Sequence, residues 1–281
     1  MTQKIGSGEM SLETAGGRTL RVARWRLDKP SDHPPVLFFN GIGANIEAVS
    51  PLAEALSDRG FIMFDMPGVG GSPEPTVPYN PFTMSWTAAK ILDKFGISEV
   101  DVMGVSWGGA MAQHFALQHS GRVRRVVLCA TTAGMLMVPG NPAALTKMAN
   151  PRRYIDPKFM NEHFQTLYGG AIDKARPKDA HIGRLTPPTP RGYFYQLLAM
   201  LGWTSVPGLP FLKQPTLIMM GGDDQIVVPI NGKILATLIP NSTLVEIEDG
   251  GHLFLLTHEE QSIRTIREFL DSPEAEARAA A

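Results

Sequence analysis

Short apolar runs alternate with amphipathic stretches along most of this chain. The apolar runs are typical of buried strands and fall at residues 35–39, 61–64, 100–103, 125–130, 216–220 and 243–247. Between them, apolar positions recur at helical spacing and predict helices at 46–59, 82–95, 230–238 and 259–270. The alternating pattern at 19–27 predicts an antiparallel edge strand. Strands that alternate with helices form a mostly parallel sheet covered by helices on both faces, so we expect an α/β fold.

The alternation is interrupted between residues 132 and 207. This segment is rich in proline, and its pattern predicts helices near 147–149, 158–168 and 191–201. We therefore expect 132–207 to form a helical cap. It is inserted between a first part of the core, 1–131, and a second part, 208–281.

The composition is that of an ordinary soluble globular protein. Of the 281 residues, 43% are hydrophobic and 19% are charged, and the net charge is −1. No basic run indicates nucleic acid or an anionic membrane as a partner, and the single cysteine, Cys129, cannot form a disulfide within the chain. The uncharged stretches 126–146 and 192–212 are broken by glycine and proline, so we expect no transmembrane segment. Residues 1–10 lack the apolar core of a signal peptide, and we expect a cytoplasmic protein.

A candidate nucleophile follows the apolar run at 100–103. The sequence Gly104-Val-Ser-Trp-Gly108 joins this predicted strand to a predicted helix that carries Met111 and Phe115. Gly-x-Ser-x-Gly in this context is typical of a nucleophile elbow, in which a strained turn holds the serine above the sheet. The glycines lack a Cβ, so strand and helix can approach closely around the turn. We therefore expect Ser106 to be the nucleophile of an acyl-transfer reaction.

A nucleophilic serine needs a histidine base and an acid that orients this base. The strand at 216–220 is followed by Gly221-Gly-Asp-Asp-Gln225, and the strand at 243–247 is followed by Asp249-Gly-Gly-His252. Both loops follow strand ends, where open α/β sheets keep their ligand sites. We expect His252 to be the base and Asp224 the acid. Asp223 and Asp249 stay open as alternatives for the acid.

The oxyanion formed during acyl transfer needs two backbone N–H donors. We expect one from Trp107, directly after the nucleophile, and the other from Ile42 in the loop after the strand at 35–39, with Gly41 as the alternative. Gly41-Ile-Gly43 also resembles the start of a dinucleotide fingerprint, but the third glycine of such a fingerprint would fall at Ile46. No spacing of cysteine or histidine is typical of a metal site, so we expect neither cofactor nor metal.

With these residues placed, the chain resembles the α/β-hydrolases over nearly its full length. More closely, it resembles the intracellular poly(3-hydroxyalkanoate) depolymerases of the medium-chain-length type. The matching segments are 39–45, 104–110, 137–140, 151–154, 201–205 and 251–255. Asn40 stands where many α/β-hydrolases have histidine, and three of the matching segments fall in the expected cap.

The resemblance implies a serine esterase with Ser106 as nucleophile, His252 as base and Asp224 as acid. The implied substrate is a storage polyester held in cytoplasmic granules, so a granule surface is an implied partner. The sequence does not predict an oligomeric state.

Other functions use the same fold and stay open. A carbon–carbon bond hydrolase would need cations in the cap, for which Arg152, Arg153 and Arg184 are available. A carboxylesterase of small molecules would keep the same catalytic residues. A small-molecule receptor and a granule coat protein are alternatives that would not need turnover.

The stretch 192–212 is rich in apolar and aromatic side chains and has no charge. We expect part of it to form, with Met135 and Met137, an apolar acyl pocket between the cap and Ser106. Trp203 and Gly41 complete the expected substrate contacts. Such a pocket predicts a preference for medium-chain monomers, because each buried methylene contributes about 0.8 kcal/mol.

Overall fold

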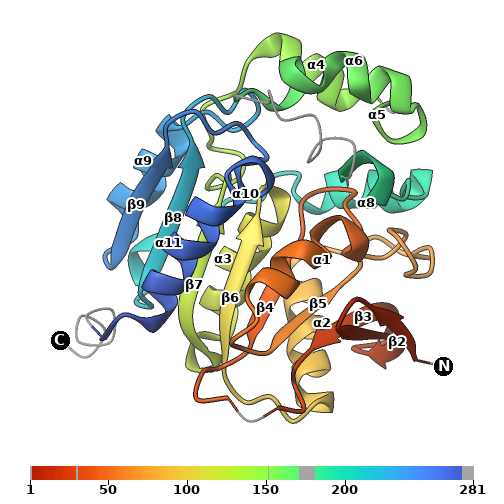
Figure 1. Cartoon of the computed structure of the whole chain (residues 1–281), viewed down its shortest axis with the longest axis vertical. Coiled ribbons are helices and arrows are strands. Elements are labelled where there is room, and N and C mark those ends of the chain that lie inside the picture. The colour runs from red at the N-terminus through yellow and green to blue at the C-terminus, as the bar shows by residue number, and fades with distance from the viewer. Residues whose placement is uncertain (1, 30, 151, 171–180, 274–281) are drawn as a thin grey trace.

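The computed structural model describes residues 2–29, 31–150, 152–170 and 181–273 (Figure 1). Within these residues the chain forms a nine-stranded sheet of order β1-β2-β3-β5-β4-β6-β7-β8-β9. The strands are β1 (Gln3–Ile5), β2 (Gly8–Ala15), β3 (Arg18–Trp25), β4 (Val36–Phe39), β5 (Phe61–Phe64), β6 (Val100–Val105), β7 (Val123–Cys129), β8 (Thr216–Gly221) and β9 (Ser242–Ile247). Residues 274–281, expected to end the second core part, lie outside the described residues.

The expected mostly parallel sheet is confirmed. Strands β5, β4, β6, β7, β8 and β9 pair in parallel, whereas β1, β2 and β3 are antiparallel to their neighbours. The expectation of an edge strand at 19–27 is wrong, because β3 pairs with β2 on one side and with β5 on the other. Val22 and Ala23 are adjacent and both buried, in core clusters on opposite faces of the sheet. Burial on both faces is the property of an inner strand.

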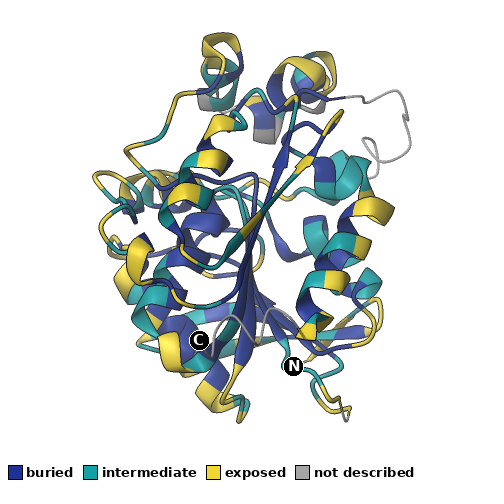
Figure 2. Cartoon of the chain, turned by 90° about the vertical axis from the view of Figure 1, so that its left-hand side faces the viewer, coloured by how far each residue is buried: buried dark blue, intermediate teal, exposed yellow. Residues whose placement is uncertain are grey.

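Helices cover both faces of the sheet. α1 (Ile46–Ala55) and α11 (Glu259–Asp271) contribute to one core cluster, and α2 (Pro81–Lys94), α3 (Trp107–Gln118) and α9 (Ile230–Leu238) contribute to the other. Figure 2 shows the strands buried between these layers, with the outer turns of the helices exposed.

The alternating side chains of β4 join the two layers. Leu37 and Met111 of α3 belong to one buried cluster, whereas Phe38 and Leu52 of α1 belong to the other. Successive side chains of a strand point to opposite faces, so an unbroken apolar run supplies both clusters. The central strands are thereby fixed from both sides, and their carboxyl ends form a rigid platform.

The segment between β7 and β8 contains helices α4 (Pro142–Ala149), α5 (Arg152–Ile155), α6 (Pro157–Tyr168) and α8 (Pro190–Ala199) and the short turn η2 (Leu209–Phe211). In Figure 1, α4, α5 and α6 lie at the top, above the sheet, and α8 lies lower on the right, above α1. Three of them begin with proline after a residue whose side chain accepts a backbone N–H of the first turn, namely Asn141, Asp156 and Thr189. The prolines that interrupt the sequence pattern therefore start helices here. We refer to residues 132–207, which contain the four helices, as the cap, and these bounds are a proposal.

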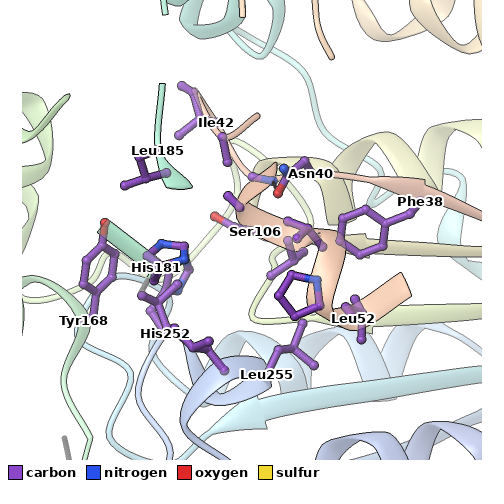
Figure 3. Close-up of a pocket in the computed structure, with 18 of the residues that line it drawn as sticks. Phe38, Asn40, Ile42, Leu52, Ser106, Tyr168, His181, Leu185, His252 and Leu255 are labelled. Carbon is purple, nitrogen blue, oxygen red and sulfur yellow. Dashed lines mark hydrogen bonds between the residues drawn. The ribbon is translucent and has the colours of Figure 1, made fainter. Parts of the chain in front are cut away.

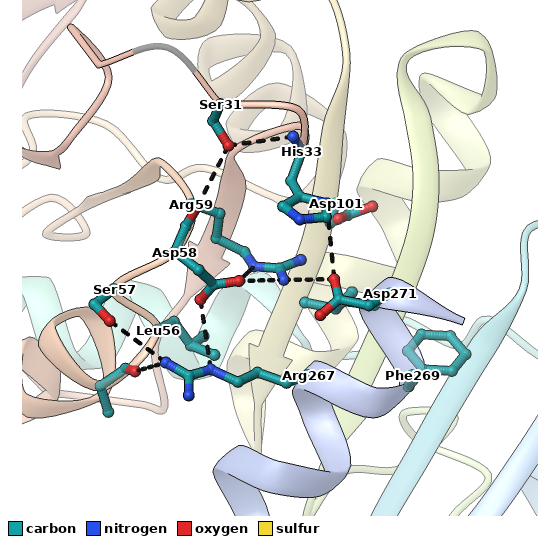
Figure 4. A network of polar contacts seen from close by, with 12 residues as sticks. Ser31, His33, Leu56, Ser57, Asp58, Arg59, Asp101, Arg267, Phe269 and Asp271 are labelled. Carbon is teal, nitrogen blue, oxygen red and sulfur yellow. Dashed lines mark hydrogen bonds and ion pairs between the residues drawn. The ribbon is translucent and has the colours of Figure 1, made fainter. Parts of the chain in front are cut away.

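Helix α1 ends at Ala55, before the predicted end at residue 59. The following turn directs Arg59 into the protein, where its side chain is fully buried. Its guanidinium donates to the carboxylates of Asp58 and of Asp271 at the end of α11, and Arg267 also pairs with Asp58 (Figure 4). This network joins the loop before β5 to the last helix.

Cys129 is buried, as the sequence predicts. Within the described residues, no helix combines the length and the apolar character that crossing a membrane requires.

The Arg59 network predicts that removing its carboxylates destabilises the protein more than removing the arginine. The double variant Asp58→Asn, Asp271→Asn removes both charges to which the fully buried Arg59 guanidinium bonds and is expected to lower the free energy of unfolding by about 3–5 kcal/mol. Arg59→Met fills the buried site with an apolar side chain and leaves two partly exposed aspartates, so it is expected to cost less. Denaturant melts of both variants test the order, and a larger loss for Arg59→Met would contradict the prediction.

Candidate active site

Ser106 lies in a sharp turn between β6 and α3. Its backbone has φ 54° and ψ −122°, which costs a residue other than glycine roughly 1–3 kcal/mol and persists only where the surroundings fix it. The Ser106 N–H donates to the carbonyl of Cys129 at 2.9 Å. The Ser106 carbonyl accepts from the Gly109 N–H at 2.9 Å and from the Thr131 hydroxyl at 2.7 Å. β7 and the residues after it therefore hold the strained turn in place.

The two glycines of the motif allow backbone to pack against backbone. A Cβ on Gly104 would collide with the backbone of Gly108. A Cβ on Gly108 would collide with the carbonyl group of Phe39, at the end of β4. The close approach that the sequence pattern predicts is therefore present, and it places the turn directly beside the loop that follows β4.

His252 and Asp224 form a buried pair. His252 Nδ1 lies 2.7 Å from Asp224 Oδ2, and Asp224 Oδ1 accepts the N–H groups of Ile226 at 2.8 Å and Val227 at 2.9 Å. Both oxygens of the Asp224 carboxylate thus form hydrogen bonds. The carboxylate binds Nδ1 of the imidazole, so Nε2 is the ring nitrogen that can exchange a proton with a substrate or with Ser106. The alternative acids, Asp223 and Asp249, are exposed.

The loops that carry the acid and the histidine are locked to each other and to the cap. The Asp223 N–H donates to the Gly250 carbonyl at 2.9 Å, and the His252 N–H donates to the Tyr168 carbonyl at 2.6 Å. A Cβ on Gly251 would collide with that same carbonyl, so glycine is required there. The Tyr168 ring, at the end of α6, stacks over the His252 ring with centroids 6.3 Å apart.

The loop after β4 is held by side chains on both of its flanks. Asn40 Oδ1 accepts the Gly41 N–H at 2.9 Å, and Asn40 Nδ2 donates to the Asn45 carbonyl at 3.0 Å. The Gly43 N–H donates to Gln196 Oε1 of α8 at 2.9 Å. The Gly41 N–H is therefore bound within the loop, as expected for a turn that its own side chains hold.

Asp65, at the end of β5, supports the same loop from below. Its Oδ1 accepts the Ile46 N–H at 2.8 Å, and its Oδ2 accepts from Arg21 Nε at 2.6 Å and from the Gly71 N–H at 3.0 Å. Burial raises the pKa of Asp65 to about 6, although the Arg21 charge and these hydrogen bonds act in the opposite direction. These contacts give Asp65 a supporting role beneath the loop.

A cavity of about 980 Å³, including its open mouth, lies in front of Ser106 (Figure 3). Ser106, His252, Asn40, Gly41 and Ile42 all line it. In Figure 3 the Ser106 hydroxyl points toward the side of the cavity where the His252 and His181 rings lie. Most of the remaining wall is aliphatic and comes from Ala48, Val49, Pro51 and Leu52 of α1, from Leu185, and from Leu253, Leu255 and Leu256 in and before α10 (Phe254–Thr257).

Three residues expected to contact substrate lie outside this lining. Met135 is 61% exposed, and neither it nor Met137 lines the cavity. The Trp203 indole N–H donates to His114 Nδ1 at 3.2 Å, on the side of α3 that faces away from the cavity. The wall comes instead from segments that directly follow Ile42 and His252 in the sequence. This adjacency is the signal that could have identified them.

Two basic side chains also line the cavity. Burial lowers the pKa of His181 to about 4, and the charge of Arg184 acts in the same direction, so the ring is neutral at pH 7. Arg153 is buried and donates to the Tyr193 hydroxyl at 3.0 Å. Of the three arginines considered for substrate binding, Arg153 lines the cavity, whereas Arg152 and Arg184 do not.

Among the described residues, His33, Asp58 and Asp271 bring possible metal-ligand atoms within 4.8 Å of one another. They belong to the network of Figure 4, where Arg59 bonds to both carboxylates. The guanidinium groups of Arg59 and Arg267 already pair with these carboxylates, so the geometry is that of an ion-pair network.

Comparison with known proteins agrees with this geometry. A family profile described as alpha/beta hydrolase fold matches residues 34–167 and 186–259. A poly(3-hydroxyalkanoate) depolymerase of Ectopseudomonas oleovorans is 46% identical over 239 residues, which are 84% of each chain. A 2-hydroxymuconate semialdehyde hydrolase of Pseudomonas putida is 30% identical over 77% of this chain and 79% of its own.

Solved structures show the same fold at lower identity. An esterase from Exiguobacterium antarcticum superposes with a TM-score of 0.78 at 19% identity, covering 95% of this chain and all of the other. A thermophilic esterase from Thermogutta terrifontis gives 0.74 at 24% identity, covering 93% and 96%. With the family profile and the 46% identical relative in agreement with the sheet order and the elbow, the chain belongs to the α/β-hydrolase family.

Proposed function

We propose that the chain is a serine esterase that hydrolyses the ester bonds of medium-chain-length poly(3-hydroxyalkanoate). The observation that carries the proposal is the strained Ser106 in an aliphatic cavity that it shares with His252, itself bonded to Asp224. The relative that is 46% identical supports a polyester as the substrate. A carboxylesterase of small molecules would use the same residues, and comparing polymer with small esters separates the two.

The proposed reaction is acyl transfer through Ser106. His252 Nε2 takes the hydroxyl proton as Ser106 attacks the ester carbonyl, and Asp224 stabilises the imidazolium that forms. The N–H groups of Ile42 and Trp107 donate to the oxyanion of the tetrahedral intermediate. Collapse expels the alcohol end of the chain, which receives the proton from His252. Water, deprotonated by His252, then attacks the acyl-enzyme and releases the hydroxy acid.

The aliphatic wall is the proposed binding surface for the alkyl side chain of the monomer. Val49 and Leu52 of α1 and Leu255 of α10 face the cavity from one side. Gly41 remains a proposed contact near the reacting ester. An apolar wall gains free energy with each methylene that it removes from water, so it favours longer side chains.

We also propose that the cap binds the surface of the polymer in cytoplasmic granules. Phe194, Leu197, Leu198 and Leu201, in and just after α8, are 58%, 50%, 36% and 78% exposed. Their spacing of three, four and seven residues places them on one helical face. Met135 extends this surface, because its N–H bonds to the Trp203 carbonyl just beyond Leu201. A neutral polyester suits a surface without charge, whereas an anionic membrane would favour lysine and arginine.

A carbon–carbon bond hydrolase is the second candidate. It is favoured by Arg153, which places a buried cation in the wall of the cavity where a substrate carboxylate could bind. The relative named 2-hydroxymuconate semialdehyde hydrolase supports it at 30% identity. The higher identity of the depolymerase and the aliphatic wall weigh against this candidate.

The first prediction from the proposed function concerns the length of the alkyl side chain of the monomer. A pentyl side chain has four more methylenes than a methyl one, worth up to about 3 kcal/mol or roughly 200-fold if fully buried. Purified protein is therefore expected to degrade poly(3-hydroxyoctanoate) faster than amorphous poly(3-hydroxybutyrate), and p-nitrophenyl octanoate faster than the acetate. Ser106→Ala is the control and should lower turnover by about 10⁶-fold. Faster degradation of the short-chain polymer would contradict the substrate class, and faster turnover of a dienoate ring-cleavage product would favour the second candidate.

The second prediction distinguishes the acids. Asp224→Asn removes the charge that orients and stabilises His252, so turnover should fall roughly 10³- to 10⁴-fold. Asp223→Asn, at the neighbouring exposed position, is the matched control and should leave turnover nearly unchanged. Steady-state hydrolysis of p-nitrophenyl octanoate measures both. Equal losses in the two variants would reject the assignment.

The third prediction concerns the exposed face of α8. The double variant Phe194→Asp, Leu201→Asp puts charge on the proposed polymer-binding surface and should slow degradation of polymer particles by about tenfold or more, because apolar burial at the interface is lost. Hydrolysis of soluble p-nitrophenyl octanoate should not change. Leu12→Asp, on β2 and 59% exposed, is the control for an added surface charge. Unchanged degradation of particles by the double variant would refute this surface.

A further inference from the structure

We infer that Gln196 of α8 is a positioning residue that holds the oxyanion hole in its working geometry. The inference rests on the proposed esterase function, because the hole matters only where Ser106 forms an oxyanion on its substrate. Gln196 has no contact with the cavity itself and acts through its neighbours. It connects the cap to both segments that carry the proposed donors.

The contacts of Gln196 reach both sides of the oxyanion hole. Its Oε1 accepts the N–H of Gly43, the residue after Ile42, at 2.9 Å. Its backbone carbonyl accepts the indole N–H of Trp107 at 3.0 Å. Both bonds are buried, and Gln196 itself has no exposed surface. One residue of the cap therefore binds next to one proposed donor and to the side chain of the other.

The orientation of the Gln196 amide is set by Gly43. Rotation of the amide would turn Nε2 toward the Gly43 N–H, and two donors would then face each other. In the observed orientation, Nε2 is buried without a hydrogen-bond partner among the described residues. An unsatisfied buried donor costs stability, and an apolar side chain of similar length would avoid this cost. The distinctive contribution of glutamine at this position is therefore the acceptor that it offers to Gly43.

The loop that Gln196 contacts needs support from above. Gly43 has φ 70°, a left-handed conformation that glycine adopts easily and can leave easily. Asn40 and Asp65 fix the two ends of the loop, at Gly41 and Ile46, whereas the bond to Gln196 fixes its middle. Without that bond, the peptide units around Ile42 gain rotational freedom. An oxyanion hole stabilises the transition state only when its donors are already aligned, so such freedom slows the reaction.

Gln196→Met tests the inference, because methionine has a similar length and volume but offers no strong acceptor to Gly43. The kcat for p-nitrophenyl octanoate should fall about 10- to 100-fold, less than the loss of a whole donor and comparable to a misplaced group, while KM changes little. Affinity for an octyl trifluoromethyl ketone, which forms a tetrahedral adduct with Ser106, should fall in parallel with kcat/KM. The melting temperature should change little, because the variant removes the unsatisfied Nε2 but leaves the buried Gly43 N–H without its acceptor. Gln196→Glu, which restores an acceptor oxygen, should recover part of the lost kcat.

Ser205→Ala is the matched control. The Ser205 hydroxyl donates to Gln113 Oε1 at 2.6 Å in another buried bond between the cap and α3, away from the oxyanion loop. Its loss should lower the melting temperature and leave kcat unchanged. Wild-type hydrolysis combined with full kcat and full ketone affinity in Gln196→Met would overturn the inference alone. A wild-type chain that hydrolyses no ester would overturn the proposed function and the inference with it.

Discussion

Direct packing of backbone against backbone around Ser106 is the constraint on which the site depends. Gly104 and Gly108 allow the end of β6 and the start of α3 to approach within a distance that any Cβ would block. The same contact brings Gly108 against Phe39, so the turn at Ser106 and the loop after β4 have fixed positions relative to each other. The unfavourable φ of Ser106 is held by hydrogen bonds from β7 and Thr131. The strain in this one residue is thus offset by contacts with β4, β7 and Thr131.

The cap takes part in this construction as well as covering the cavity. Tyr168, at the end of α6, accepts the His252 N–H and stacks on its ring, while Gln196 of α8 binds the loop of Ile42. Asn45 adds a third link, because its side chain donates to the Arg184 carbonyl and accepts the Thr186 N–H. His252, the loop of Ile42 and the cap are therefore linked to one another by direct contacts. A displacement of the cap would disturb the orientation of the proposed base and of the proposed oxyanion donors together.

The sequence patterns predicted those features of the fold and the site that depend on short local motifs. The strand and helix alternation, the elbow at Ser106, and the Ser106, Asp224, His252 order follow from short motifs and their place after strands. The structure pairs His252 with Asp224 and leaves Asp223 and Asp249 exposed. The sequence alone could not identify which aspartate bonds to the histidine, because the direction of each side chain depends on the path of the loop. The cavity wall was missed because Val49 reads as an ordinary position on a helical stripe. Whether such a residue faces the core or a cavity depends on where the helix sits above the sheet, which is a property of the tertiary fold.

The apolar stretch of α8 shows why composition alone cannot predict which side chains of a helix face the core and which face solvent. Its inner face carries Gly192, Gln196 and Ala199, and Gly192 approaches Gly68 so closely that a Cβ on it would collide with the backbone there. Small and hydrogen-bonding residues thus attach the helix to the core, and the large apolar side chains point outward. A helix of a globular protein normally has the opposite arrangement, because burial of its apolar face drives its packing. The inverted arrangement binds the cap by close contact and specific hydrogen bonds, which leaves the hydrophobic surface exposed, as the proposed binding of polymer requires.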